Sequence, residues 1–242
     1  MRDQICTALV GGLLALGAAP AHAAAIYVAN HSFEDQALPE GGFINGFGPS
    51  GWSAGYAEPS GPLNPLINEF ADPVPDGQNV MFSATGYDGS PYYSGDVYQT
   101  VASSLAANTR YTLMVDVGRS NFSDLADFAV ELTGGSFLNF SILAAGSFDS
   151  LAPGEFRTLT ITFDSVEAQD LPLSIRLRTM HDPDQGQGQR LAFFDNVRLD
   201  ASAINAGAVP EPATWAMMIL GFGGMGAVLR RRNDGASAPF RA

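Results

Sequence analysis

The chain has 242 residues and a formal charge of −13, with 12 Lys plus Arg against 25 Asp plus Glu. A surface this acidic repels nucleic acid and anionic lipid, whereas it suits solubility, cation binding or neutral sugars. The single cysteine, Cys6, lies near the start of the chain. The rest of the chain therefore has no thiol for a disulfide, a thiolate metal site or a nucleophile.

Residues 1–23 have the pattern of a secretory signal peptide. An apolar run from Ile5 to Ala19 is followed by Ala21-His22-Ala23, which places small residues at both key positions of a cleavage site. We predict cleavage after Ala23. Residues 24–208 would then carry 7 Arg, no Lys and 22 acidic residues, a formal charge of −15, in a span suited to one domain.

Between these ends, apolar residues alternate with polar ones at a period of two. In residues 109–118, for example, Leu113 and Val115 fall on one side of an extended chain and Met114 on the other. Half-buried strands separated by Gly, Pro and Asp turns are typical of antiparallel sheets packed face to face. We therefore predict an all-β, two-sheet antiparallel sandwich over residues 24–200. The predicted strands are residues 109–118, 127–132, 136–143, 156–163, 172–178 and 190–199.

Two segments do not follow this alternation. Residues 36–76 are dense in Gly, Pro and aromatic residues, and they are too long for a simple turn. Long ordered loops on a sandwich commonly carry binding surfaces. Residues 201–208 are small and uncharged, which predicts a short flexible linker.

Short motifs occur at both ends of the predicted domain. They are Asn30-His-Ser-Phe-Glu34, Gly51-Trp52, Tyr98-Gln99-Thr100, Thr109-Arg-Tyr-Thr-Leu113 and Phe194-Asp-Asn-Val-Arg-Leu199. Together they resemble the galactose-binding-like jelly roll, the fold of many carbohydrate-binding modules. The resemblance implies a jelly-roll sandwich whose first and last strands are neighbours.

The same resemblance implies a structural calcium ion. In such modules the carboxylate of the Phe-Glu step and the aspartate of Asp-Asn-Val often share the ion with backbone carbonyls. That nominates Glu34 and Asp195, with the carbonyl of Ser32 and a group from residues 76–79. Calcium takes six to eight oxygen ligands, so two carboxylates and carbonyls are a reasonable start. In the alternative, Asp195 hydrogen-bonds a turn and Glu34 is solvated.

Aromatic residues in or beside the loop-rich regions predict a sugar-binding surface. A sugar needs aromatic faces against its C–H patches and polar groups for its hydroxyls, in a concave site. The candidates are Trp52, Tyr56, Tyr92 and Tyr93. In the alternative these side chains belong to the core, and Trp52 in particular packs under the first strand.

No catalytic motif stands out. The sequence has no Gly-x-Ser-x-Gly elbow and no His-Glu-x-x-His motif. After the signal peptide the histidines are His31 and His181, so a nucleophilic triad has almost no candidate base. We expect a protein that is not an enzyme. A glycosidase-type pair of carboxylates stays open among the many acids, although nothing marks one pair out.

The carboxyl-terminal stretch combines a stiff collar, an apolar run and a basic triplet. Their order is Val209-Pro210-Glu211-Pro212, the uncharged residues 213–229 and Arg230-Arg231-Arg232. Prolines disfavour helix in the collar. The apolar run would form about 25 Å of transmembrane helix, close to the lower limit for crossing a bilayer. The arginines would keep their end in the cytoplasm, with residues 233–242 as a cytoplasmic tail. An ordinary single-span anchor has the same plan.

With Trp215 near the start of the apolar run, residues 209–232 resemble the PEP-CTERM protein-sorting domain. The resemblance implies a Gram-negative bacterium, recognition by the membrane-embedded exosortase and cleavage at Pro-Glu-Pro. The protein would pass through the inner membrane to the cell surface or an exopolysaccharide (biofilm) matrix. We therefore predict an exported, non-catalytic protein that binds extracellular polysaccharide. The alternatives are a structural matrix protein without a defined ligand and a secreted polysaccharide hydrolase.

Overall fold

The computed structural model describes residues 23–54, 59–85, 94–136, 138–180, 189–204 and 217–222. The predicted signal peptide up to residue 22, the Pro-Glu-Pro motif and the three arginines lie outside these ranges. Residues 217–222 are helical, and the rest of the predicted transmembrane helix 213–229 lies outside the described residues. Among the residues described, no helix is long and apolar enough to cross a membrane.

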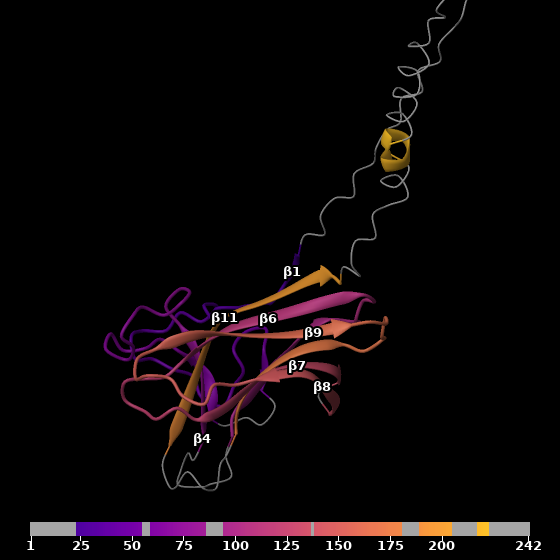
Figure 1. Cartoon of the computed structure of the whole chain (residues 1–242). Helices are drawn as coiled ribbons and strands as arrows, with labels where there is room; N and C mark the ends of the chain where they lie inside the picture. Colours follow the sequence, from indigo (N-terminus) through magenta and orange to yellow (C-terminus); the bar gives the residue numbers. More distant parts are fainter. Residues whose placement is uncertain are drawn as a thin grey trace, which may run out of the picture. The chain divides into compact units, whose positions relative to one another are not determined.

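Residues 21–204 form one compact unit built from two sheets (Figure 1). The six-stranded sheet has the order β3 (Ser60–Leu63), β4 (Val80–Thr85), β11 (Arg190–Ala203), β6 (Thr109–Gly118) and β9 (Phe156–Ser165), with β1 (Ala24–Ile26) also paired to β11. The five-stranded sheet has the order β2 (Ser53–Ala54), β5 (Asp96–Ala102), β10 (Leu173–Met180), β7 (Asp127–Ser136) and β8 (Asn139–Gly146). Every pairing between these strands is antiparallel. The predicted all-β, two-sheet antiparallel sandwich is confirmed.

Period-two alternation places the core between the sheets. Leu113, Val115 and Val117 of β6 are buried, as are Ile175 and Leu177 of β10. The neighbouring residues along each strand point to the outer face of the sheet. The predicted strands 109–118, 156–163 and 190–199 start at the residues where β6, β9 and β11 begin. The pairing of β1 with β11 also confirms that the first and last strands are neighbours.

The predicted linker starts too early, because β11 continues to Ala203. Ala201 lies opposite Ala24 of β1 and Tyr111 of β6, and Ala203 lies opposite Thr109. The prediction of a linker is therefore wrong for residues 201–203. Small uncharged residues give no local sign of pairing, and here the neighbouring strands supply the hydrogen bonds.

Candidate functional site

A bend in β11 brings the two predicted calcium ligands to the same loop. The pairing of β11 with β6 shifts register between Asp195 and Arg198, and Asn196 has a left-handed φ of 50°. Asp195 is fully buried at this bend. Its Oδ2 accepts a hydrogen bond of 2.9 Å from the backbone N–H of Asp76, and its Oδ1 accepts one of 2.6 Å from the N–H of Asn196.

Glu34 holds the next residues of that loop. Its Oε1 accepts hydrogen bonds from the N–H groups of Gln78, at 2.7 Å, and Asn79, at 2.6 Å. Gly77 lies between these contacts with a φ of 81°, and a Cβ there would overlap the Glu34 carboxylate. The structure thus brings Glu34, Asp195 and residues 76–79 together.

The electrostatics of Asp195 are unusual for an aspartate. The pKa of this carboxyl is raised from 3.8 to about 8, chiefly because burial removes water from it. The nearby Asp76 and Asp116 carboxylates also raise the pKa, and the backbone hydrogen bonds from Asp76 and Asn196 lower it. Among the described residues, no basic side chain pairs with it. At neutral pH this carboxyl therefore either keeps its proton or needs a cation beside it.

The donors at the bend fit a calcium ion only if carbonyls contribute. Ser32 is buried and lines the same hollow as Glu34. In the described part of the chain, no group of three or more His, Cys, Asp or Glu side chains is placed to hold a metal. Calcium accepts backbone carbonyls and water as well as carboxylates, so the buried, unpaired charge of Asp195 is the feature that suits a cation here.

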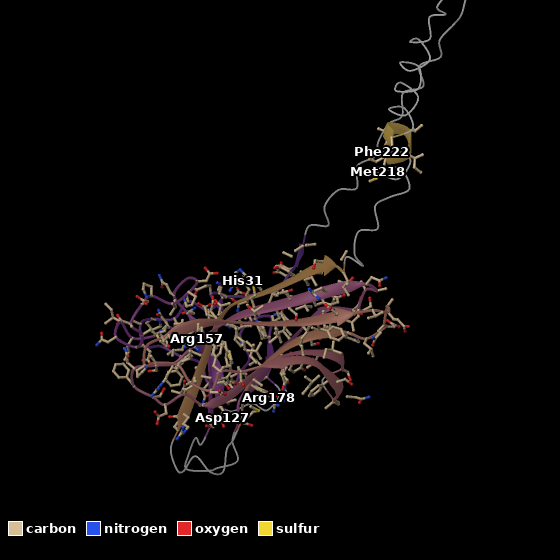
Figure 2. All side chains as sticks on the ribbon, viewed as in Figure 1. His31, Asp127, Arg157, Arg178, Met218 and Phe222 are labelled. Carbon is tan, nitrogen blue, oxygen red and sulfur yellow. The ribbon has the colours of Figure 1, made fainter. Side chains whose placement is uncertain are left out.

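A hollow of about 630 Å³ adjoins this bend. Its lining includes the side chains of Tyr27, His31 and Asp35 on one side and Met114 and Arg198 on the other. Figure 2 shows His31 on the side of the sandwich that carries β1 and β11. The hollow has the size of a small-molecule site, with both apolar and ionisable groups at its surface.

The outer face of the five-stranded sheet carries a second group of charges, and here they are paired. Asp96 and Glu131 are buried although they face away from the core. Arg176, between them on β10, donates to Asp96 from both Nε and Nη2, with Nε at 2.9 Å from Oδ2. Arg178, two residues after Arg176 on β10, lies on the same face and contacts Glu131 Oε1 at 2.8 Å. Arg176 Nη1 also lies 3.5 Å from Glu131 Oε2. This contact is an ion pair without a hydrogen bond, because Oε2 accepts no hydrogen bond from the described residues.

Arg176 also forms part of a flat surface with two aromatic rings. Its Cζ lies 5.0 Å from the centroid of the Phe140 ring, within the range of a cation–π contact. Tyr98, Phe140 and Arg176 line one shallow hollow. Its remaining lining residues are Thr133, Gly135, Ser136 and Ser174. Two buried carboxylates therefore fix a guanidinium over the Phe140 ring, and Tyr98 and several hydroxyl-bearing residues line the same hollow.

The predicted sugar-stacking residues fare differently. Trp52 is 6% exposed, its ring lies 5.6 Å from that of Phe33, and its indole N–H donates to the Ala29 carbonyl at 3.1 Å. The expectation of an exposed Trp52 is therefore not met, because the indole packs against the segment that follows β1. Tyr56, Tyr92 and Tyr93 lie outside the described residues.

Sequence reasoning did not select Tyr98, Phe140 or Arg176 for a binding surface. The alternation of apolar residues could have assigned Tyr98 and Arg176 to the outer face of the sheet. Each follows a buried apolar residue, Val97 or Ile175, and adjacent residues of a strand point to opposite faces. Nothing local indicates that two separate strands place aromatic rings around one arginine. That proximity depends on the order β5-β10-β7-β8 in the sheet.

Two family models match the chain. Residues 24–200 match the HpiC1-like family, described as HpiC1 cyclase. Residues 208–232 match the PEP-CTERM protein-sorting motif, which confirms the resemblance of this stretch and marks the protein for export. No curated protein matches the chain.

Several solved structures are similar to this chain at low identity. An arabinose-bound α-L-arabinofuranosidase is 12% identical with a TM-score of 0.46, over 74% of this chain and 26% of that enzyme. A family 16 carbohydrate-binding module is 15% identical with a TM-score of 0.40, over 64% of this chain and 96% of the module. A CBM61 module in complex with β-1,4-galactotriose is 13% identical with a TM-score of 0.40, over 72% and 96%.

These structural likenesses are too distant to indicate a ligand. The family model is of a different kind, because it covers most of the chain, including both sheets and the bend of β11. By this match, the chain belongs to the HpiC1-like family.

Proposed function

We propose that the protein is an exported, non-catalytic glycan-binding module of the cell surface or the exopolysaccharide matrix. The glycan would bind on the outer face of the five-stranded sheet. The observation that carries this proposal is the flat surface of Tyr98, Arg176 and Phe140, which buried carboxylates hold in place. A rigid platform loses little conformational entropy when a ligand binds.

The chemistry of this surface suits a sugar ring. Aromatic rings accept the C–H face of a pyranose, and the hydroxyl groups beside them exchange hydrogen bonds with sugar hydroxyls. Thr100 Oγ1 and Ser174 Oγ, 2.8 Å apart, already form such a pair on this face. The predicted residues Tyr56, Tyr92 and Tyr93 stay in the proposal, because Tyr56 follows β2 in the sequence, and Tyr92 and Tyr93 precede β5, within a few residues.

The charges favour neutral glycans. The guanidinium of Arg176 contacts two carboxylates, so this face offers little free positive charge to an acidic sugar. The −15 formal charge of residues 24–208 acts in the same direction. We therefore expect neutral polysaccharides to bind more tightly than uronic-acid polymers.

Calcium is part of the proposal as a structural ion. Asp195 and Glu34, with the carbonyl of Ser32 and a group from residues 76–79, would hold it at the bend of β11. When bound, the ion supplies the positive charge that allows the buried Asp195 to ionise. It would fix the bend and the loop and take no part in a reaction.

The sorting tail would deliver this module to its place of action. Exosortase would recognise Val209-Pro210-Glu211-Pro212, Trp215 and Arg230-Arg231-Arg232 while the tail is in the inner membrane, and would then release or transfer the protein. Mass spectrometry of surface-delivered protein tests this step. An intact Arg230–Arg232 on that protein would contradict it.

Affinity electrophoresis and calorimetry on soluble galactan, xylan and β-glucan test the binding site. Phe140→Ala should weaken binding to the preferred polymer about tenfold, because it removes one stacking face and the rest of the platform stays. Leu138→Ala is the matched control, since Leu138 is 92% exposed on the same hairpin and does not line the hollow. If no neutral polymer is retained, the structural matrix protein becomes the better description.

The family description favours a second function of a different class, a cyclase. Asp195 has the protonation state of a general acid at neutral pH when no cation is beside it. Its full burial separates it from any substrate in this geometry, which is why binding comes first. A cyclisation that only rearranges bonds conserves mass. Liquid chromatography coupled to mass spectrometry would detect the product as a new peak of unchanged mass in a metabolite extract incubated with the protein, but not with Asp195→Asn. The absence of such a peak would remove the cyclase.

A further inference from the structure

The six-stranded sheet carries a second apolar cluster on its outer face. Its buried members are Phe70, Val80, Phe82 and Phe193. Phe82 of β4 lies opposite Phe193 of β11, while their neighbours Met81 and Phe194 point into the main core. These two strands are therefore apolar on both faces, which requires a cover over the outer face.

The loop between β3 and β4 covers this cluster incompletely. Phe70 from the loop packs edge-on against Phe193, with ring centroids 5.2 Å apart. A pocket of about 240 Å³ stays open next to it. Its apolar lining is Phe43, Pro59, Leu63, Phe82, Leu191 and Phe193, and its polar lining is Asn45, Glu69 and Gln189. The volume is just below the usual range for drug-sized ligands, so it suits a single ring.

Phe43 forms the outer wall of the pocket and is 62% exposed. Its ring meets that of Phe82 edge to face, with centroids 6.0 Å apart. The backbone on either side is fixed to β3, because Ile44 N–H donates to Pro62 O at 3.0 Å and Asn64 N–H donates to Gly42 O at 2.9 Å. An exposed aromatic ring on such a rigid backbone leaves one face free for a ligand at little entropic cost.

The polar groups of the pocket require a ligand that donates hydrogen bonds. The Oδ1 atom of Asn45 is buried and accepts no hydrogen bond from the described residues. Glu69 accepts a hydrogen bond from the Ser120 hydroxyl and adds negative charge. An acyl chain would offer no hydrogen bond to the polar side chains of the pocket, and an anionic ligand would be repelled by Glu69. A sugar ring can place its C–H face against the apolar lining and donate hydrogen bonds from its hydroxyl groups to the polar lining.

We propose that this pocket is a second glycan site, which takes one neutral sugar ring between Phe43 and the polar side chains. The ligand class rests on the proposed function, whereas the site itself is separate. The first site lies on the outer face of the five-stranded sheet and the second on the outer face of the six-stranded sheet. One module can therefore engage two polysaccharide chains and cross-link them.

The decisive experiment weakens the first site and measures how much binding of single sugar rings remains. Methyl β-glucoside, methyl β-galactoside and methyl β-xyloside serve as single-ring probes in saturation-transfer NMR, with affinities from titration. In the Phe140→Ala protein we expect continued transfer to at least one probe. Adding Phe43→Leu should weaken that binding about tenfold, and Phe43→Tyr should preserve it, because leucine keeps the apolar wall but not the flat face.

Phe47→Leu is the matched control, since Phe47 is 71% exposed and does not line the pocket. Unchanged binding in Phe43→Leu would overturn the proposal, and so would complete loss of probe binding in Phe140→Ala alone. The latter result would leave the first site intact as a proposal. Conversely, loss with Phe43→Leu and none with Phe140→Ala would support the second site and contradict the first.

Cross-linking gives an independent readout. The wild-type protein should make a solution of its preferred neutral polymer turbid at concentrations where each single variant, Phe140→Ala or Phe43→Leu, binds but does not aggregate it. Equal turbidity with either variant would contradict two sites on one module.

Discussion

Two groups of buried carboxylates, one in each sheet, are treated in opposite ways. Asp96 and Glu131, on the outer face of the five-stranded sheet, contact the guanidinium of Arg176, and Glu131 also contacts Arg178. Asp195, in the six-stranded sheet, accepts backbone N–H bonds and pairs with no basic side chain among the described residues. Burial raises its pKa to about 8, although the backbone hydrogen bonds lower it.

In the first group the charges are balanced within the protein, whereas the carboxyl of Asp195 needs a proton or an ion from the solvent. A buried ion pair satisfies its charges within the protein, so removing one partner is costly. A buried lone carboxyl needs either a proton or an external cation, and its state therefore depends on pH and on metal. We expect three experiments to distinguish the two sheets.

The largest effect should come from pH acting on Asp195. Below about pH 4 both the folded and the unfolded protein hold this proton, and between about pH 4 and pH 8 only the folded protein does. Because the folded pKa is the higher one, stability falls as pH rises through this window. In chelator, the free energy of unfolding should decrease by roughly 5 kcal/mol across it.

Thermal melts in chelator and in calcium check this prediction. Calcium should remove most of the decline, because an ion that binds only the folded protein stabilises it and favours the ionised carboxyl. Asp195→Asn serves as the control and should show a flatter pH profile in chelator. A melting temperature that chelator does not change would argue against Glu34 and Asp195 as ligands.

Removal of an arginine tests the paired carboxylates. Arg176→Met should lower the free energy of unfolding by about 3–5 kcal/mol, because it removes the guanidinium that the buried carboxylates of Asp96 and Glu131 share. Arg110→Met is the matched control, since Arg110 contacts Asp164 at 2.7 Å on an exposed surface. Urea denaturation should show little change for that control. Equal losses in the two variants would mean that burial on this face does not matter.

The smallest effect concerns the loop that joins Glu34 to Asp195. Gly77→Ala should cost about 1–3 kcal/mol, because φ is 81° and the new Cβ would overlap the Glu34 carboxylate. Gly41→Ala has similar backbone strain, with φ of 72°, against the flexible end of Leu66. Only the Gly77 variant should also reduce the calcium-dependent rise in melting temperature, and a reduction in both would contradict a local effect.

The sequence alone was sufficient for the architecture of the main core. Alternation in residues 109–118 and 156–163 predicts strands whose apolar sides are those that the structure buries. It was also sufficient for the sorting motif, because that signal is a linear order of residues within 208–232. Both are local patterns, so they survive without knowledge of the fold.

Only the tertiary structure decided which outward-facing residues gather into sites. Phe140, Arg176 and Asp96 are adjacent because β8, β7, β10 and β5 are ordered in that way. Trp52 is buried because the segment that follows β1 packs against it. Alternation assigns each residue to a face, but it does not say which strands are neighbours or which loop covers them. The desolvation that raises the pKa of Asp195 likewise depends on the whole surrounding fold.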